Sequence, residues 1–182
     1  RRQRQMCIRD RVKVYEAGYI FGRSGFGQRR PKDLESYYTL RFGPPRQIHG
    51  HFDHLSLTYW DRGRNIIVDA GHPGYVRGPL RSYAQSRLAH NVLTVRGKEH
   101  DAEAASRLVD HQIEESWSAF DLEDTAWEGL RWNRSACFVD CGPFVVSDSL
   151  EPTRTVEYAE QRWNVAPEFE YCLLYTSDAA DE

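Results

Sequence analysis

Residues 135–150 read SACFVDCGPFVVSDSL, and this stretch decides the fold class. Two runs rich in valine, phenylalanine and other strand-forming residues, 135–139 and 144–150, flank the triplet CGP at 141–143. Glycine and proline between two such runs are typical of a tight turn that joins antiparallel strands. The stretch therefore predicts a β-hairpin.

The same pattern continues on both sides of this hairpin. The tetrapeptide DRGR at 61–64 predicts a second hairpin turn. Seven short strands, with little 3.6-residue periodicity between them, predict an all-β protein built as an antiparallel β-sandwich. Only residues 102–109 are expected to be helical. The five strands outside the first hairpin are expected at residues 49–59, 65–69, 91–95, 112–117 and 155–164.

The two ends of the sequence read as translations of a DNA sequencing adapter. Residues 6–10, MCIRD, match one reading frame of a transposon adapter that ends in AGATGTGTATAAGAGACAG. Residues 172–181, CLLYTSDAAD, match the reverse complement of the same adapter in another frame. We therefore expect residues 1–11 and 172–182 to be adapter-derived and residues 12–171 to be a fragment of one domain.

Composition narrows the classes of function. The formal net charge is −3 at pH 7, and it becomes −4 without the five basic and four acidic residues of the end segments. The basic N-terminus then gives no indication of nucleic-acid binding, and an acidic substrate would need local basic groups. Cys137 and Cys141 alone remain, which form neither a disulfide framework nor a zinc ribbon. No apolar run approaches the roughly 18 residues of a membrane span.

The motif HGHFD at 49–53 is the first candidate for chemistry. Side chains alternate between the two faces of a strand, so His49, His51 and Asp53 are expected to share one face. A lone pair of histidines at this spacing is more often structural than metal-binding. The motif therefore needs partners elsewhere in the chain.

Two such partners follow at the ends of neighbouring predicted strands. Asp69 closes the apolar run IIV eighteen residues after His51, and His90 precedes a strand thirty-nine residues after His51. Two imidazoles and one carboxylate can provide three ligands of a tetrahedral zinc site, and they also suit other divalent metals. The ordinary alternative is a turn aspartate and a hydrogen-bonded histidine. We assign four other histidines to that ordinary class: His54, His72, His100 and His111.

Four segments, in their order and spacing, resemble the C-terminal domain of heparinase II/III-like polysaccharide lyases. The resemblance covers roughly residues 15–167. It implies a fragment of the C-terminal β-sandwich of a longer chain, whose N-terminal α/α toroid is missing. The segments are YEAGY at 15–19, HGHFDHLS at 49–56, VDAG at 68–71 followed by Tyr75, and SRLAHNV at 86–92.

The resemblance assigns the metal ligands. His51, Asp69 and His90 match the family's ligand positions, and the divalent metal there is usually Zn²⁺. By the resemblance, this ion stabilises the sandwich and positions loops, and it takes no part in the chemical step.

The resemblance also implies a reaction. Lyases of this family cleave next to a uronate by β-elimination, in which a base removes the C5 proton and the C4 oxygen leaves. Their substrates are acidic polysaccharides such as heparin, heparan sulfate and alginate. His49 matches a catalytic histidine in the substrate cleft, and Arg23 and Tyr75 fall near segments that can face this cleft. The toroid supplies a Tyr and an Asn or His, so the fragment alone is expected to be inactive. A periplasmic, cell-envelope or secreted location follows.

Two other functions fit parts of the pattern. A non-catalytic carbohydrate-binding β-sandwich would share the fold and would lack an upstream toroid. An Fe(II) oxygenase would use His51, Asp53 and His90 as a facial triad, with Arg96 binding a 2-oxoacid. Metal analysis separates the oxygenase from the lyase, because the carboxylate ligand is Asp53 in the first and Asp69 in the second.

Overall fold

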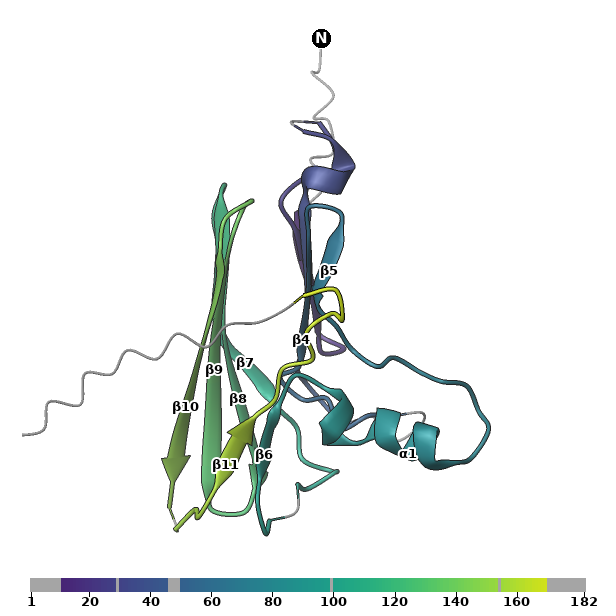
Figure 1. Ribbon diagram of the computed structural model, residues 1–182. Coiled ribbons are helices and arrows are strands. Elements are labelled where there is room, and N and C mark those ends of the chain that lie inside the picture. Colours follow the sequence, from purple (N-terminus) through teal and green to yellow (C-terminus); the bar gives the residue numbers. More distant parts are fainter. Residues whose placement is uncertain (1–10, 29, 46–49, 99, 154, 170–182) are drawn as a thin grey trace, which may run out of the picture.

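The computed structural model describes residues 11–28, 30–45, 50–98, 100–153 and 155–169. Within these residues the chain forms two antiparallel sheets that face each other, and a two-stranded ribbon lies beside them (Figure 1). The antiparallel β-sandwich predicted from the sequence is confirmed.

The first sheet has the strand order β1-β2-β3-β4-β5, with each strand antiparallel to the next. The predicted DRGR turn joins β4 to β5, and its residues Arg62 and Gly63 have φ values of 47° and 79°. Positive φ at both central residues is typical of a type I′ turn, whose twist matches that of the strands it joins. The strands are β1 (Val12–Tyr15), β2 (Tyr19–Arg23), β3 (Ser36–Arg41), β4 (Leu57–Asp61) and β5 (Arg64–Ile67).

The second sheet has the order β10-β9-β8-β7 and is also antiparallel throughout. The CGP triplet joins β9 to β10 as predicted, with Phe138 opposite Phe144. In β8 every second side chain from Ser118 to Ala126 is buried, as expected for a strand with one face on the core. The strands are β7 (Arg107–Ile113), β8 (Trp117–Trp127), β9 (Leu130–Val139) and β10 (Phe144–Pro152).

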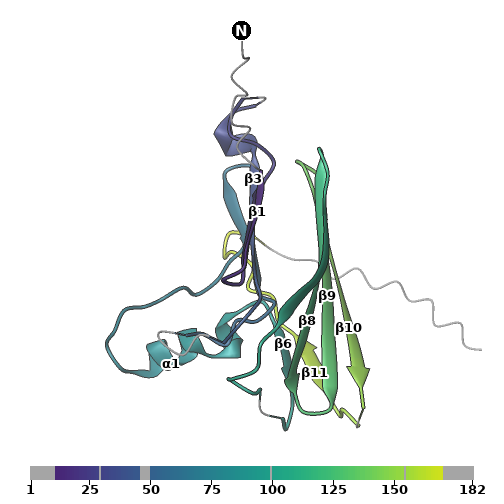
Figure 2. The same ribbon diagram turned by 180° about the vertical axis from the view of Figure 1, so that it is seen from behind.

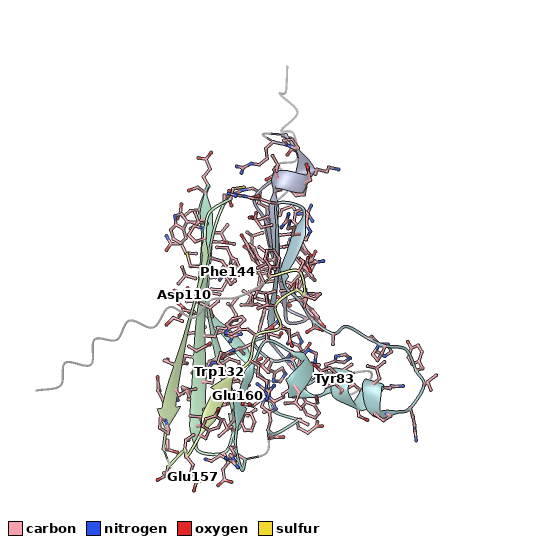
Figure 3. The ribbon with its side chains drawn as sticks, in the orientation of Figure 1. Tyr83, Asp110, Trp132, Phe144, Glu157 and Glu160 are labelled. Carbon is pink, nitrogen blue, oxygen red and sulfur yellow. The ribbon has the colours of Figure 1, made fainter. Side chains whose placement is uncertain are left out.

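The hydrophobic core lies between the two sheets. Tyr38 of β3 stacks on Phe138 of β9 with 3.7 Å between ring centroids, and the Tyr38 hydroxyl lies 2.6 Å from Ser118 Oγ. Trp132 is fully buried, and Figure 3 shows its side chain and that of Phe144 in the space between the sheets. Each fully buried side chain of this kind contributes roughly 1.5–3 kcal/mol. The core therefore holds the two sheets together. It also fixes the position of the sheet end from which the loops of the candidate site extend.

The segment between β5 and β6 leaves the sandwich and carries two of the predicted ligands. It runs through a loop, α1 (Pro79–Gln85) and the 3₁₀ turn η2 (Arg87–Ala89). It returns as β6 (Leu93–Val95), which pairs with β11 (Ala159–Gln161). Figures 1 and 2 show α1 and its loop projecting from the first sheet, away from the second. Another 3₁₀ turn, η1 (Lys32–Leu34), precedes β3.

The described part of the HGHFD segment is a loop, so the prediction of a strand at residues 49–59 is wrong for its first half. The amide of Ser56 donates to the carbonyl oxygen of Asp53 at 2.9 Å, and Leu55 has a φ of 62°. Such a left-handed residue interrupts extended backbone, and β4 begins only at Leu57. The argument that strand alternation places the motif's side chains on one face therefore fails. His49 lies outside the described residues.

Two other predicted elements also differ from the structure. Residues 102–109 contain no helix, because the chain turns and then enters β7. Residues 112–117 hold the β7–β8 turn, where the Glu114 amide donates to the carbonyl oxygen of Trp117 at 2.9 Å. Strand β7 is almost wholly exposed at the sheet edge, so its sequence lacks the apolar alternation by which strands are found. The strands β1, β2, β3 and β8 and the helix α1 were not predicted.

No helix of the described residues is long and apolar enough to span a membrane.

Candidate metal centre

Three loops meet at one end of the first sheet and bring the predicted ligands together. The first is the loop before β4, which carries His51; the second follows β5 and carries Asp69; the third follows η2 and carries His90. The Phe52 amide donates to the carbonyl oxygen of Gln85 in α1 at 3.0 Å, which ties the first loop to the helix. The projecting segment is therefore anchored beside the HGHFD loop.

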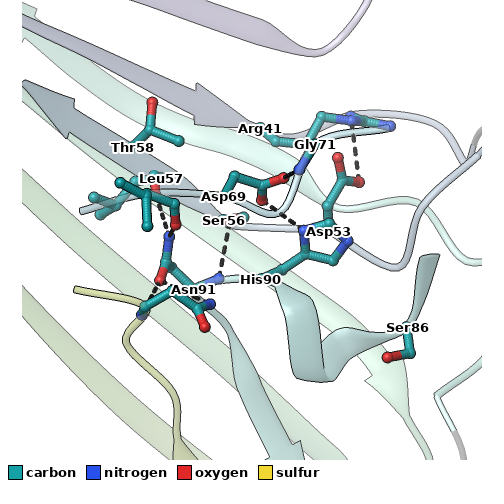
Figure 4. Close-up of polar contacts among 12 residues, drawn as sticks. Arg41, Asp53, Ser56, Leu57, Thr58, Asp69, Gly71, Ser86, His90 and Asn91 are labelled. Carbon is teal, nitrogen blue, oxygen red and sulfur yellow. Dashed lines mark hydrogen bonds and ion pairs between the residues drawn. The ribbon is translucent and has the colours of Figure 1, made fainter. Parts of the chain in front are cut away.

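Asn91 holds these loops in fixed positions relative to one another. It is fully buried, and its side-chain amide donates to the carbonyl oxygens of Leu57 and Val68, both at 2.8 Å (Figure 4). Its backbone amide donates to Ser56 Oγ at 3.1 Å, and its side-chain oxygen accepts from the Asn164 amide at 2.6 Å. One side chain thus satisfies the backbone of three segments next to His90. Sequence reasoning did not single out this asparagine.

His90 and Asp69 form a direct pair. His90 Nδ1 lies 2.6 Å from Asp69 Oδ2, and the other Asp69 oxygen accepts from the Gly71 amide at 2.8 Å (Figure 4). Burial alone would raise the pKa of Asp69, but the hydrogen bond and positive charge of His90 outweigh it, and the pKa is lowered. Asp69 is therefore held as a carboxylate, which is the form that binds a cation.

His51 is the third member of this group. Its ring centroid lies 5.2 Å from that of His90, and burial together with the neighbouring His90 lowers its pKa against the opposing effect of Asp53 and Asp69. A neutral imidazole is the form that binds metal. We call His51, Asp69 and His90 the first cluster.

The first cluster fits a divalent metal in its chemistry. Its donors are two imidazoles and a carboxylate, which suit zinc and other divalent ions. His90 is 1% exposed, and its Nε2 has no hydrogen-bond partner among the described residues. A buried polar atom without a partner is rare and indicates a missing ligand or water. The three ligand atoms are more widely spaced than those of a second group described below, so His51 would have to approach the other two.

Aromatic rings and a basic side chain lead outward from the first cluster. The ring of His72 lies 6.1 Å from that of His51, and the ring of Tyr75 lies 5.1 Å from that of His72. The guanidinium of Arg81 stands 5.8 Å above the Tyr75 ring, and Tyr75 is 70% exposed. Tyr75, a predicted substrate-binding residue, therefore lies on an exposed face that continues from the first cluster.

Arg23, the other predicted substrate-binding residue, lies elsewhere. It pairs with Tyr37 near the start of β3, whereas the first cluster lies past the far end of that strand. Its guanidinium stacks over Phe26 and Tyr37, at 4.8 and 5.3 Å, and borders a small pocket with Trp60. The structure does not bring Arg23 and Tyr75 to one place.

Asp53 is engaged by an arginine. Arg41 Nε lies 3.6 Å from Asp53 Oδ1, and burial raises the pKa of Asp53 against the opposing charges of Arg41, His90 and His51 (Figure 4). The carboxylate that hydrogen-bonds to His90 is Asp69. This pairing gives no support to the oxygenase triad that would use Asp53.

Comparison with known proteins agrees with the fold. A model of the family described as "Heparinase II/III-like, C-terminal" matches residues 16–180. The chain belongs to the heparinase II/III-like family. The matched range enters the segment that we predict to be adapter-derived, so that assignment stays a prediction.

Relatives of known activity are heparin and heparan sulfate lyases. A curated heparin-sulfate lyase of Bacteroides stercoris is 26% identical over 117 residues, which is 62% of this chain and 17% of that protein. The crystal structure of the heparan sulfate lyase HepC from Pedobacter heparinus matches with a TM-score of 0.73 and 21% identity, over 85% of this chain and 24% of that one. A solved heparinase III matches with a TM-score of 0.69 and 21% identity, over 80% and 23%. The chain thus spans less than a quarter of the length of these relatives.

The structure also contains a second group of metal-ligand side chains. His54, His100 and Asp124 each offer one ligand atom, and these atoms lie within 4.8 Å of one another. In the described part of the chain this is the one group of metal-ligand type with so close a spacing. We call it the second cluster. Sequence reasoning missed it because it assigned His54 and His100 to ordinary roles and did not predict β8, which carries Asp124.

A buried arginine of the second sheet supports the site loops from behind. Arg134 of β9 is fully buried, and its Nη1 donates to the carbonyl oxygens of Leu55 and Asn91 at 2.7 and 2.8 Å. Its other nitrogens donate to both carboxylate oxygens of Asp148, at 2.8 and 2.9 Å. Arg134 therefore fixes two of the three loops relative to the second sheet. A charged residue amid alternating apolar positions of a strand was the signal that could have revealed it.

Proposed function

We propose that this chain is part of a polysaccharide lyase that cleaves a uronic-acid-containing polysaccharide by β-elimination. The observation that carries the proposal is the match of residues 16–180 to the heparinase II/III-like family. The relatives of known activity act on heparin-type polysaccharides, and the substrate class that we propose is heparin- or heparan-sulfate-like or alginate-like. We also propose a periplasmic, cell-envelope or secreted location, because such polysaccharides are encountered outside the cytoplasm.

β-Elimination requires groups that neutralise the substrate carboxylate and move protons at C5 and at the C4 oxygen. We propose that His49, which directly precedes the described loop, neutralises charge or transfers a proton. His72, Tyr75 and Arg81 form the exposed face beside the first cluster and are suited to binding a polyanion. A toroid encoded upstream would supply the remaining catalytic groups. Arg23 is not included in this face because it lies at the other end of the sheet.

The first cluster would hold the family's divalent ion, for which we propose zinc. His51, Asp69 and His90 would be its ligands, and the ion would supply a cross-link between their loops. Asn91 and Arg134 keep those loops in place by hydrogen bonds to their backbone. In this arrangement the chain's own task is to present His49 and the exposed face at a fixed position toward the substrate.

The proposal is tested with the full-length protein that contains this chain. It is incubated with heparan sulfate, heparin and alginate, and the unsaturated uronate at the new chain end is followed by its ultraviolet absorbance. The proposal expects release of unsaturated products from at least one polymer. Binding to a polymer without release of unsaturated products would support a carbohydrate-binding module and overturn the lyase proposal. Absence of unsaturated products from all of the uronate polymers would also overturn it.

A further inference from the structure

The second cluster joins three separate parts of the fold. His54 comes from the loop before β4, His100 follows β6, and Asp124 lies on β8 of the second sheet. His100 Nε2 lies 3.0 Å from Asp124 Oδ2, and the rings of His54 and His100 are 5.6 Å apart at 62°. The cluster thus connects the HGHFD loop to the opposite sheet.

Its polar atoms are buried and incompletely paired. Asp124 is 0% exposed and His54 is 4% exposed. The Nδ1 atoms of His54 and His100 have no hydrogen-bond partner among the described residues. A buried polar atom destabilises the fold if it is left without a partner. Three metal-ligand side chains that converge in the interior with spare nitrogens therefore indicate a ligand.

We propose that His54, His100 and Asp124 form a second metal site, separate from the first cluster, for a divalent ion of the zinc class. Imidazole and carboxylate donors suit zinc, cobalt and related ions better than magnesium or calcium. A cavity of about 460 Å³ borders His54 and His100 and is lined also by His51, Phe52 and Glu103. This cavity gives an ion a path to the histidines, which a buried site needs.

The surroundings offer one competing explanation. Burial lowers the pKa of the Arg87 guanidinium, and the charge of nearby Asp124 opposes this effect. The two terminal nitrogens of Arg87 have no hydrogen-bond partner among the described residues. Arg41 also faces His54 and lowers its pKa. Asp124 could then serve only as a counter-charge for His100 and Arg87, with no metal involved.

Metal stoichiometry separates the two explanations. The chain is stripped with a chelator, dialysed against Zn²⁺, and its bound zinc is measured by mass spectrometry. We expect two zinc ions per chain, and one in each of the variants His54→Gln, His100→Asn and Asp124→Asn. His90→Asn removes the ion of the first cluster and is expected to keep the other. His111→Gln, on the exposed strand β7, is the matched control and should keep both.

A second measurement protects the test against misfolding. In the His90→Asn background, added Co²⁺ should give the visible absorption of a low-coordinate site and raise the melting temperature. Adding His100→Asn should abolish both effects, with the far-ultraviolet circular dichroism unchanged. The chain could instead bind one ion that is lost in His100→Asn and kept in His90→Asn. This result would still support the second cluster as a metal site and would count against the first cluster. A His90→Asn chain that binds neither Zn²⁺ nor Co²⁺ would overturn the proposal.

Discussion

The two clusters have the same composition, two histidines and one aspartate, yet they stand in different environments. The first is made by loops at one end of the first sheet, and its carboxylate, on Asp69, is partly exposed. The second reaches across to β8, and its carboxylate, on Asp124, is fully buried. Both draw a histidine from the loop before β4. The same ligand chemistry can therefore support an exposed face or join two sheets, depending on which element supplies the carboxylate.

The largest expected effect separates catalysis from metal binding at the first cluster. In the full-length protein, we expect His49→Ala to lower turnover of the polysaccharide by about 10²- to 10⁴-fold, because it removes a proton-transfer or charge-neutralising group. Bound zinc and melting temperature should hardly change. His51→Ala should first lose metal and stability, and activity should fall as a consequence. Steady-state kinetics and metal analysis on the same preparations measure this difference.

Two outcomes would contradict the roles of His49 and His51. A His49→Ala enzyme with full lyase activity would exclude His49 from the mechanism. A His51→Ala enzyme that keeps its metal would exclude the first cluster as a metal site. His111→Gln again serves as the control, because this side chain lies on the exposed edge strand.

The next largest effect concerns the arginine behind the loops. Arg134→Met leaves Asp148 without its buried cation and frees the carbonyl oxygens of Leu55 and Asn91. Each carbonyl oxygen left unpaired in the interior costs about 1–3 kcal/mol. Equilibrium denaturation should show this loss in the free energy of unfolding. Arg131→Met is the matched control on the same strand, because Arg131 is exposed and its surface pairs are worth about 0–1 kcal/mol. Equal losses in the two variants would contradict the supporting role of Arg134.

Metal removal should have an effect of intermediate size. A ligand that binds only the folded state stabilises it by about 2.7 kcal/mol when its free concentration is a hundred times its dissociation constant. We expect a chelator to lower the melting temperature of the chain, and zinc to restore it. His90→Asn and His100→Asn should each remove part of this zinc-dependent rise, and the double variant should remove all of it. A chain whose melting temperature does not respond to zinc would contradict metal binding at both clusters.

The fold class could be predicted because turns and strands leave local marks. The DRGR and CGP turns required residues that tolerate positive φ or end a strand, and both hairpins were predicted. The grouping of Asp69 with His90 was suggested by their places at the ends of predicted strands, and the family pattern then assigned both as ligands. The strand assumed for the HGHFD motif was wrong because Leu55 turns the chain. Asp124 and Arg134 were missed because their burial arises from sheets packing together, which local composition does not record.

The smallest expected effect distinguishes the two ends of the first sheet. Tyr75 is exposed beside His72 and Arg81, on the face that continues from the first cluster. Arg23 stacks on Phe26 and Tyr37 near the opposite end of β3. Loss of one stacking contact with a sugar is worth on the order of 1 kcal/mol, by analogy with aromatic pairs.

In the full-length protein we therefore expect Tyr75→Ala to raise the KM for the polysaccharide a few-fold, with little change in kcat. Tyr75→Phe should retain most of the affinity, because the ring and not the hydroxyl provides the contact. Arg23→Ala should leave the KM unchanged. The Arg23 and Tyr75 variants can be compared directly because both side chains lie outside the core. A rise in KM for Arg23→Ala and none for Tyr75→Ala would place the substrate at the other end of the sheet and remove the exposed face from the proposed cleft.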